Sequence, residues 1–209
     1  MSSEVDGPVR RVPRAEVRRR LVASAAQEFA EHGYVASKLE RIAFAAGFTK
    51  GAVYSNFGSK QALFAAVLQS RADDERERVF VESGDEAAGL AGRVGRVIAD
   101  EITSDSQRGR LGLEFAAQAT RDPAVMEAWT PLRRAHREAA KTAVVEVAAR
   151  SGLEPTVDPS VAALILHCVT NGLSMEHLAD PEEVDEEAIE AAVTVVISAL
   201  TRPQRGADR

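Results

Sequence analysis

Apolar side chains recur every three or four residues along most of this chain, and this spacing constrains its fold more than any other feature. Val17, Leu21, Ala25 and Phe29 follow one another at intervals of four, which places them on one face of an α-helix. A second stripe of this kind runs over residues 189–200. The alternating pattern of strands is nearly absent, so the sequence predicts an all-α fold.

Residues that cap or break helices divide the pattern into about nine helices. Ser37, Thr49 and Ser59 are expected to cap the second, third and fourth. Pro131 lies inside the seventh and is expected to kink it or break it in two. In order, we expect a helix that ends at residue 33 and helices over about 37–45, 49–56, 60–81, 92–103, 106–120, 123–151, 159–178 and 185–201.

Composition excludes several classes of protein. With 45% hydrophobic residues in 209, the chain can bury a sizeable core. A single cysteine, Cys168, excludes a disulfide framework and a cysteine-based zinc site. The longest apolar stretches, 161–166 and 191–200, are far shorter than the roughly 18 residues that span a bilayer. The first residues are polar and are not those of a secretory signal. We therefore expect a cytoplasmic protein without membrane contact.

The charge of the chain is unevenly distributed. The net charge is −6, yet residues 1–60 hold 10 Lys and Arg against 6 Asp and Glu. Residues 61–209 hold 16 against 26. A basic first quarter on an acidic body predicts that the first part meets an anion.

The segment 33–64 predicts two short helices joined by a tight turn. The first is expected to bury Leu39, Ile42, Ala43 and Ala46, and a glycine at 47 suits the turn. The exposed face of the second carries hydrogen-bonding groups, one cation and no carboxylate: Thr49, Lys50, Gly51, Tyr54, Ser55 and Asn56. A short helix of this kind can enter the major groove of DNA.

The order of motifs here resembles that of the tetracycline-repressor (TetR) family of bacterial transcriptional regulators. The motifs are F-x-x-x-G-Y at 29–34, I-A-x-x-A-G at 42–47, K-G-x-x-Y-x-x-F at 50–57 and S-K-x-x-L-F at 59–64. The resemblance covers about residues 14–68. It implies a three-helix DNA-binding head (13–59) and a six-helix ligand-binding and dimerisation body (60–202), flanked by disordered segments (1–12 and 203–209).

The resemblance also assigns roles to residues of the head. It implies DNA contacts by Ser37, Lys38, Thr49, Lys50, Gly51, Tyr54, Ser55, Asn56 and Lys60. The arginines of the first residues would add electrostatic affinity: Arg10, Arg11, Arg14, Arg18, Arg19 and Arg20. Two positions depart from the family pattern. Arg41 stands where an acidic residue is commoner and would add a phosphate contact, and Phe44 would thicken the core of the head.

In the body, the resemblance implies a homodimer and an effector pocket. The helices at about 159–178 and 185–201 carry apolar stripes with small residues, which suit a four-helix dimer interface or, alternatively, an intramolecular core. The fourth helix would couple the pocket to the head. His167 is a candidate polar anchor or a satisfied core histidine. The candidate pocket residues are Phe80, Leu111, Phe115, Gln118, Met126, Trp129, His136, His167 and Asn171.

The function that follows is a ligand-responsive transcriptional regulator. We expect a repressor that binds an inverted-repeat operator as a dimer and is released by a small-molecule effector. The alternative is a helical binding module or adaptor without specific DNA binding. An enzyme is not supported, because the four histidines lack metal-ligand spacing and no phosphate-binding loop motif is present. We expect no cofactor and no metal.

Overall fold

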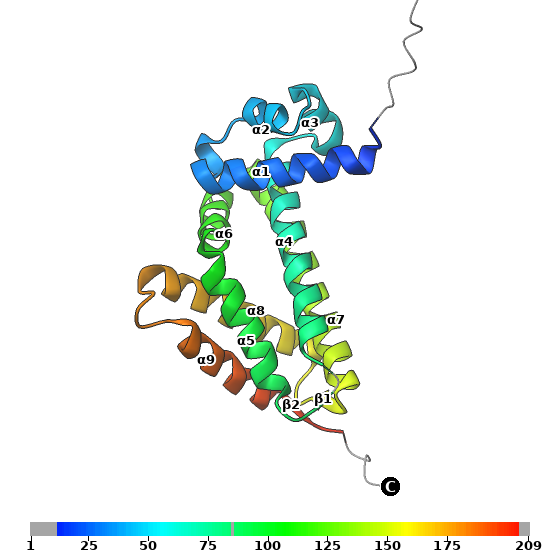
Figure 1. Ribbon diagram of the computed structural model, residues 1–209, viewed down its shortest axis with the longest axis vertical. Coiled ribbons are helices and arrows are strands. Elements are labelled where there is room, and N and C mark those ends of the chain that lie inside the picture. Colours follow the sequence, from blue (N-terminus) through cyan, green and yellow to red (C-terminus); the bar gives the residue numbers. More distant parts are fainter. Residues whose placement is uncertain (1–11, 85, 205–209) are drawn as a thin grey trace, which may run out of the picture.

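The computed structural model describes residues 12–84 and 86–204. Within them the chain is all-α, as predicted, apart from two three-residue strands (Figure 1). The elements are α1 (Arg14–Ala36), α2 (Leu39–Ala45), α3 (Lys50–Phe57), α4 (Lys60–Glu82), α5 (Leu90–Ser104), α6 (Ser106–Ala119), α7 (Pro123–Arg150), β1 (Leu153–Pro155), α8 (Pro159–Ala179), α9 (Glu186–Leu200) and β2 (Thr201–Pro203).

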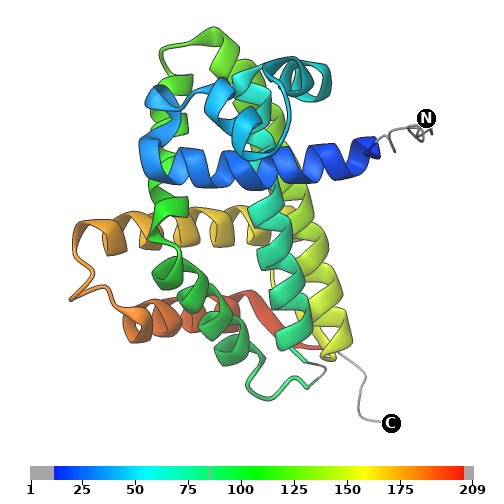
Figure 2. The ribbon, with the colours of Figure 1, turned by 45° about the horizontal axis from the view of Figure 1, so that its top comes forward.

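The helices form a small upper part and a larger lower part (Figures 1 and 2). α1 lies across the top of the molecule, with α2 and α3 above it. α4 and α7 descend side by side from this upper part, and α6 approaches it from the other side. α5 packs on α9, and α8 packs on α7. None of the helices in the described residues is long and apolar enough to cross a membrane.

The upper core is built around aromatic side chains from four helices. Phe29 and Tyr34 come from α1, Phe64 from α4, Phe115 from α6 and Trp129 from α7. Neighbouring ring centroids lie 4.7 Å (Phe29–Phe64), 4.5 Å (Phe64–Phe115) and 5.6 Å (Phe115–Trp129) apart, the spacing of favourable aromatic pairs. This core crosses the domain boundary predicted between residues 59 and 60, so the head is fixed to three helices of the body.

A second core lies in the lower part. It joins α5 and α9 with the end of α7, and its members are aliphatic. They are Leu90, Val94, Ile98, Ala99, Val147, Ile189, Val193 and Ile197. The two cores give α4 and α7 a fixed point at either end.

Side-chain caps start several of these helices. Ser59 accepts the backbone N–H three residues later at 3.0 Å, as predicted. Asp122, Asp158 and Asp185 cap α7, α8 and α9 with N···O distances of 2.9, 2.8 and 2.9 Å. Thr49 precedes α3, but its side chain makes no capping hydrogen bond.

Pro131 does not interrupt α7. The helix is continuous over 28 residues, so the predicted break is wrong. A proline deprives the carbonyl four residues earlier, that of Glu127, of its intrahelical donor. Both residues are exposed, so water can satisfy this carbonyl and the helix continues.

The two short strands were not predicted. β1 and β2 pair antiparallel, with residue 153 opposite 203. The Arg202 side chain donates to Glu154 at 2.9 Å, and the backbone N–H of Gln204 donates to the Gly152 carbonyl at 3.1 Å. Residue 203 thus belongs to this ladder and residue 204 is hydrogen-bonded beside it, although both fall in the predicted tail. Residues 1–11 and 205–209, the remainder of the predicted flanking segments, lie outside the described residues.

Candidate DNA-binding surface and interior cavity

α2 and α3 form a helix-turn-helix pair that leaves one face of α3 uncovered. α2 buries the four side chains predicted from its spacing, and Val53 anchors α3 in the same core. Gly47 adopts a φ of +78° in the turn, a conformation that suits glycine. The predicted recognition residues Thr49, Lys50, Gly51, Tyr54 and Ser55 are all exposed.

Lys50 is the one cation of this face, and it forms an ion pair with a residue of α2. Its Nζ lies 2.7 Å from Glu40 Oε1 on α2 and 5.8 Å from the ring centroid of Tyr54. The hydrogen bond with Glu40 raises the pKa of Lys50, and that with Lys50 lowers the pKa of Glu40. Lys50 is therefore a protonated donor at the surface, positioned beside the ring of Tyr54.

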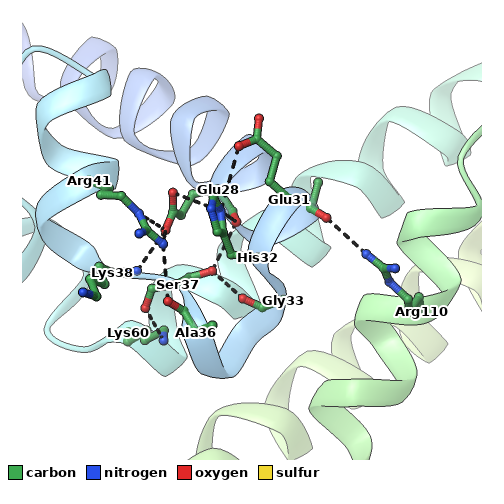
Figure 3. A network of polar contacts seen from close by, with 11 residues as sticks. Glu28, Glu31, His32, Gly33, Ala36, Ser37, Lys38, Arg41, Lys60 and Arg110 are labelled. Carbon is green, nitrogen blue, oxygen red and sulfur yellow. Dashed lines mark hydrogen bonds and ion pairs between the residues drawn. The ribbon is translucent and has the colours of Figure 1, made fainter.

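Ser37 does not cap α2, and its predicted DNA contact is not supported by its position. The side chain is buried, and its hydroxyl donates to the Gly33 carbonyl and, at 3.2 Å, to that of Glu28. The residue before α2 is Lys38, which is exposed. Its backbone N–H donates to Glu28 Oε1 at 3.0 Å (Figure 3). The cap of α2 thus comes from a side chain ten residues earlier.

Glu28 also explains Arg41, the first departure from the family pattern. Arg41 Nε donates to Glu28 Oε1 at 2.7 Å (Figure 3), so the guanidinium braces α2 against α1, although its side chain is still 44% exposed. Phe44, the second departure, is 85% exposed. The expectation that it thickens the core of the head is wrong, since the core side of α2 is already filled by its other apolar residues.

Lys60 points at the end of α1. Its Nζ donates to the carbonyls of Ser37 at 2.6 Å and Val35 at 3.2 Å (Figure 3), and it lies 4.9 Å from the ring centroid of Tyr34. Burial lowers its pKa. A cation suits the C-terminal end of a helix. A phosphate contact by Lys60 would require this ammonium group to turn away from these carbonyls.

The C-terminal end of α3 is held from α1. Arg18 donates to the Asn56 carbonyl at 3.0 Å and stacks 4.3 Å from the Phe57 ring centroid, while Arg14 reaches the Ser55 carbonyl at 3.4 Å. The Asn56 side chain is half-buried, and its amide donates to the Ala52 carbonyl at 2.8 Å. These arginines therefore orient α3. Arg19 and Arg20 pair with Glu16, and Arg10 and Arg11 lie outside the described residues.

The body encloses a cavity of about 490 Å³ that is lined by residues of α4 to α9. This volume is in the range of small-molecule sites. Four of the nine predicted pocket residues line it: Trp129, His136, His167 and Asn171.

The other five predicted pocket residues do not line the cavity. Leu111 and Phe115 are fully buried in the upper core, where their side chains pack with the aromatic cluster. Phe80 is partly exposed and lies under the Arg150 guanidinium, 3.9 Å from its ring centroid. Met126 and Gln118 belong to the upper ends of α7 and α6, away from the lining.

The lining of α7 and α8 is cationic at one end. His167 has its pKa lowered to about 4, first by burial and then by the charges of Arg133, His136 and Arg137. Its Nε2 is buried and has no hydrogen-bond partner among the described residues. Arg133 also lines the cavity, and burial lowers its pKa. Sequence reasoning missed Arg133, although it is four residues after Trp129 and three before His136 and so shares their helix face.

Models of known protein families match both parts of this molecule. The family model described as bacterial regulatory proteins, tetR family, matches residues 21–67. A second model, described as the C-terminal part of BetI-type transcriptional repressors, matches residues 93–202. The first covers the helix-turn-helix pair and the second covers most of the body.

Individual relatives agree with these matches. The transcriptional repressor AcnR of Corynebacterium efficiens is 28% identical over 155 residues, 74% of this chain and 78% of that protein. The transcriptional activator FasR of Mycolicibacterium smegmatis is 41% identical over 64 residues, 31% of this chain and 29% of that protein.

Solved structures share the fold. A TetR-family regulator from Rhodococcus sp. has a TM-score of 0.72 and 21% identity, over 89% of this chain and 98% of that one. A complex of SmeT with triclosan has a TM-score of 0.58 and 22% identity, over 91% and 93% of the two chains. SmeT is described as the repressor of a Stenotrophomonas maltophilia multidrug efflux pump.

Proposed function

The chain belongs to the TetR family of bacterial regulatory proteins, and from this premise we propose that it represses transcription by binding an inverted-repeat operator as a homodimer until a small-molecule effector releases it. It is a DNA-binding transcriptional regulator and not an enzyme. A cytoplasmic location, where the DNA of a bacterium lies, is part of the proposal.

The observation that carries the proposal is the uncovered face of α3. A short helix presents Thr49, Lys50 and Tyr54 to solvent while Val53 fixes it from behind. Lysine donates to guanine acceptors in the major groove, and hydroxyl groups donate to phosphates. Residues on this face can therefore read bases and hold the backbone at the same time.

The dimer is supported by apolar side chains that α8 and α9 leave uncovered. Val161, Leu164, Ile165 and Met175 are exposed along α8, and Val195 is 68% exposed on α9. An apolar face of this length on a monomer is typical of an interface. A second copy related by a two-fold axis would cover it and would place two heads about 34 Å apart, one turn of DNA.

The effector is supported by the cavity and its connection to the head. α4 and α6 each line the cavity and also pack against α1. A ligand that prefers one arrangement of these helices would favour one spacing of the two heads, and this preference would change the affinity for DNA. Repression is favoured over activation because the repressor-type C-terminal model covers the body.

The proposal is tested by binding of fluorescein-labelled DNA tiled from the region upstream of the gene. Fluorescence anisotropy is measured at two salt concentrations with excess competitor DNA. Tight binding to one inverted repeat, weakening steeply with salt, is the expected result. Weak and equal binding to all tiles would contradict a local operator. No binding even at low salt would favour the helical adaptor.

A further inference from the structure

The wall that α7 contributes to the cavity changes its chemistry along the helix. Trp129, Arg133 and His136 line the first half, whereas residues 139–148 contribute only alanine and valine. At 1.5 Å per residue, Arg133 and Val147 lie about 21 Å apart along the axis. This wall of the cavity therefore has a polar end and an apolar end.

Acidic side chains of α4, of α5 and of the residue that follows α5 also line the cavity, but each already has an interaction partner. Glu101 is paired with Arg78, and Asp105 with Arg71 at 3.0 Å. Glu75 likewise has an interaction partner. The lining therefore offers no carboxylate that would require a cationic ligand for its neutralisation.

Arg133 is in a different situation. Its half-buried guanidinium makes no ion pair with a carboxylate among the described residues. It lies 5.1 Å from the ring centroid of Trp129, and burial and the like charge of Arg137 lower its pKa. A buried charge without a counter-ion is costly. The unsatisfied Nε2 of His167 lies at the same end of the cavity.

We propose that the cavity binds an amphiphilic anion, with its negative head group on Arg133 and His167 and its aliphatic tail along the alanine and valine wall of α7. The anion would supply the counter-charge that Arg133 lacks and an acceptor or donor for His167. The apolar wall would remove the tail from water, which is favourable for an aliphatic chain. This inference rests on the proposed function, since it identifies the chemical class of the effector.

The test uses the one tryptophan of the chain, Trp129, which lines the polar end. The full-length protein is titrated with decanoate, decanesulfonate, decanol and decyltrimethylammonium, and Trp129 fluorescence is followed. These probes share one tail and differ in head group. The affinity for each anion is expected to be at least about ten-fold higher than the affinity for the alcohol or the ammonium. Equal or tighter binding of the ammonium, or no saturable change with either anion, would overturn the proposal.

Variants assign the preference to Arg133. Arg133→Met is expected to weaken anion binding about ten-fold, and Arg133→Lys to retain most of it. The control is Arg134→Met, because Arg134 is the next residue, is exposed and does not line the cavity. Calorimetry measures all three affinities, since the change at Arg133 alters Trp129 fluorescence directly. Unchanged affinity in Arg133→Met, with the protein folded, would overturn the assignment.

The same variants separate this inference from the proposed function. Arg133→Met is expected to bind operator DNA as the wild type does but to resist release by decanoate. A protein that binds the operator without any preference for anions contradicts only the ligand class. A protein that binds the anions but not DNA contradicts only the regulator.

Discussion

Glu28 organises the connection between α1 and the helix-turn-helix pair. Its carboxylate is 9% exposed and accepts hydrogen bonds from the Arg41 side chain and the Lys38 backbone. The Ser37 hydroxyl donates to the Glu28 carbonyl. One residue thus fixes both the start of α2 and its packing on α1, and the orientation of α3 depends on it.

The ionisation of Glu28 makes a pH-dependent contribution to stability. Burial favours the neutral acid, but the hydrogen bonds from Arg41 and Lys38 outweigh it and hold the pKa below the ordinary value of 4.5. A depressed pKa stabilises the fold above the unfolded-state value, and this stability is lost as the pH falls through the folded-state value. Glu28→Gln is therefore expected to cost about 1–3 kcal/mol of unfolding free energy at neutral pH.

Urea denaturation measures this cost. The difference between wild type and Glu28→Gln is expected to shrink as the pH falls below 4.5 and through the lowered pKa of Glu28, because the carboxylate then becomes protonated. Glu31→Gln is the matched control, since Glu31 is exposed on the same helix. A difference that persists unchanged in acid would show that the charge of Glu28 is not responsible.

Among the proposed DNA contacts, we expect the removal of Lys50 to weaken binding most. Lys50→Ala is expected to weaken operator binding by about 1–3 kcal/mol and to reduce the salt slope if the ammonium contacts phosphate, or to relax base preference if it contacts guanine. Lys141→Ala is the control, because Lys141 also pairs with one neighbouring glutamate, at 3.0 Å, but lies in the body. Anisotropy at several salt concentrations gives both quantities; equal losses in the two variants would contradict the recognition role.

Local spacing predicted the exposed face of α3, because one helix face follows from the 3.6-residue period. It could not predict the surroundings of Ser37 and Arg41. Their partner, Glu28, lies nine and 13 residues away along the chain, and only the fold of α1 against α2 brings the three together. Phe44 was misplaced for a similar reason, since an apolar residue type does not reveal which side of a short helix is already filled.

At the scale of elements, α6 stands between the cavity and the head. Its Glu114 accepts the backbone N–H groups of Tyr34 at 3.0 Å and Val35 at 3.2 Å, and Arg110 donates to the Ala30 carbonyl at 3.2 Å. Other residues of α6 line the cavity. A shift of α6 caused by a ligand would therefore move the end of α1 directly, alongside the coupling through α4 that the sequence suggested.

Gly33 is the position where this contact is tightest. Its φ is +72°, and a Cβ there would lie 2.9 Å from Glu114 Oε2. Gly33→Ala is expected to cost about 2–3 kcal/mol, from backbone strain and from displacement of the carboxylate. The control is Gly33→Ala in a Glu114→Ala background, which keeps the backbone conformation of Gly33 (φ +72°, ψ 174°) and removes the carboxylate. Thermal unfolding compares the two; equal losses would show that Glu114 yields without cost.

Most element boundaries followed from capping residues and helix-ending glycines. The exceptions have physical causes. Pro131 locally predicts a kink or a break, but the carbonyl that loses its intrahelical donor is exposed, so water can hydrogen-bond to it. β1 and β2 are too short to show a two-residue period, and each exists only because the other lies beside it.

For the whole molecule, the proposed function requires a dimer. Leu164→Asp places a charge on the uncovered face of α8 and is expected to shift the protein towards the monomer and to weaken operator binding about ten-fold or more. Val81→Asp, at an exposed apolar position on α4, is the control. Analytical ultracentrifugation measures the assembly state. A dimer that survives Leu164→Asp would place the interface elsewhere.

The cavity shows what a sequence leaves undetermined at this scale. The spacing places Phe115 and Trp129 on inward faces, but not whether an inward side chain meets a core or a hollow. Phe115 meets Phe64 and Tyr34 and is buried, whereas Trp129 reaches the cavity edge. That distinction depends on how six helices pack together, which no single helix pattern contains.

In the proposed function, two heads read one face of DNA at a spacing fixed by the body. The most direct test compares affinity for the operator with affinity for the same operator lengthened between its half-sites by about five base pairs, half a turn of the duplex. The affinity is expected to fall about ten-fold or more, because one head would then face away from its half-site. Unchanged affinity for the lengthened operator would contradict the proposed function.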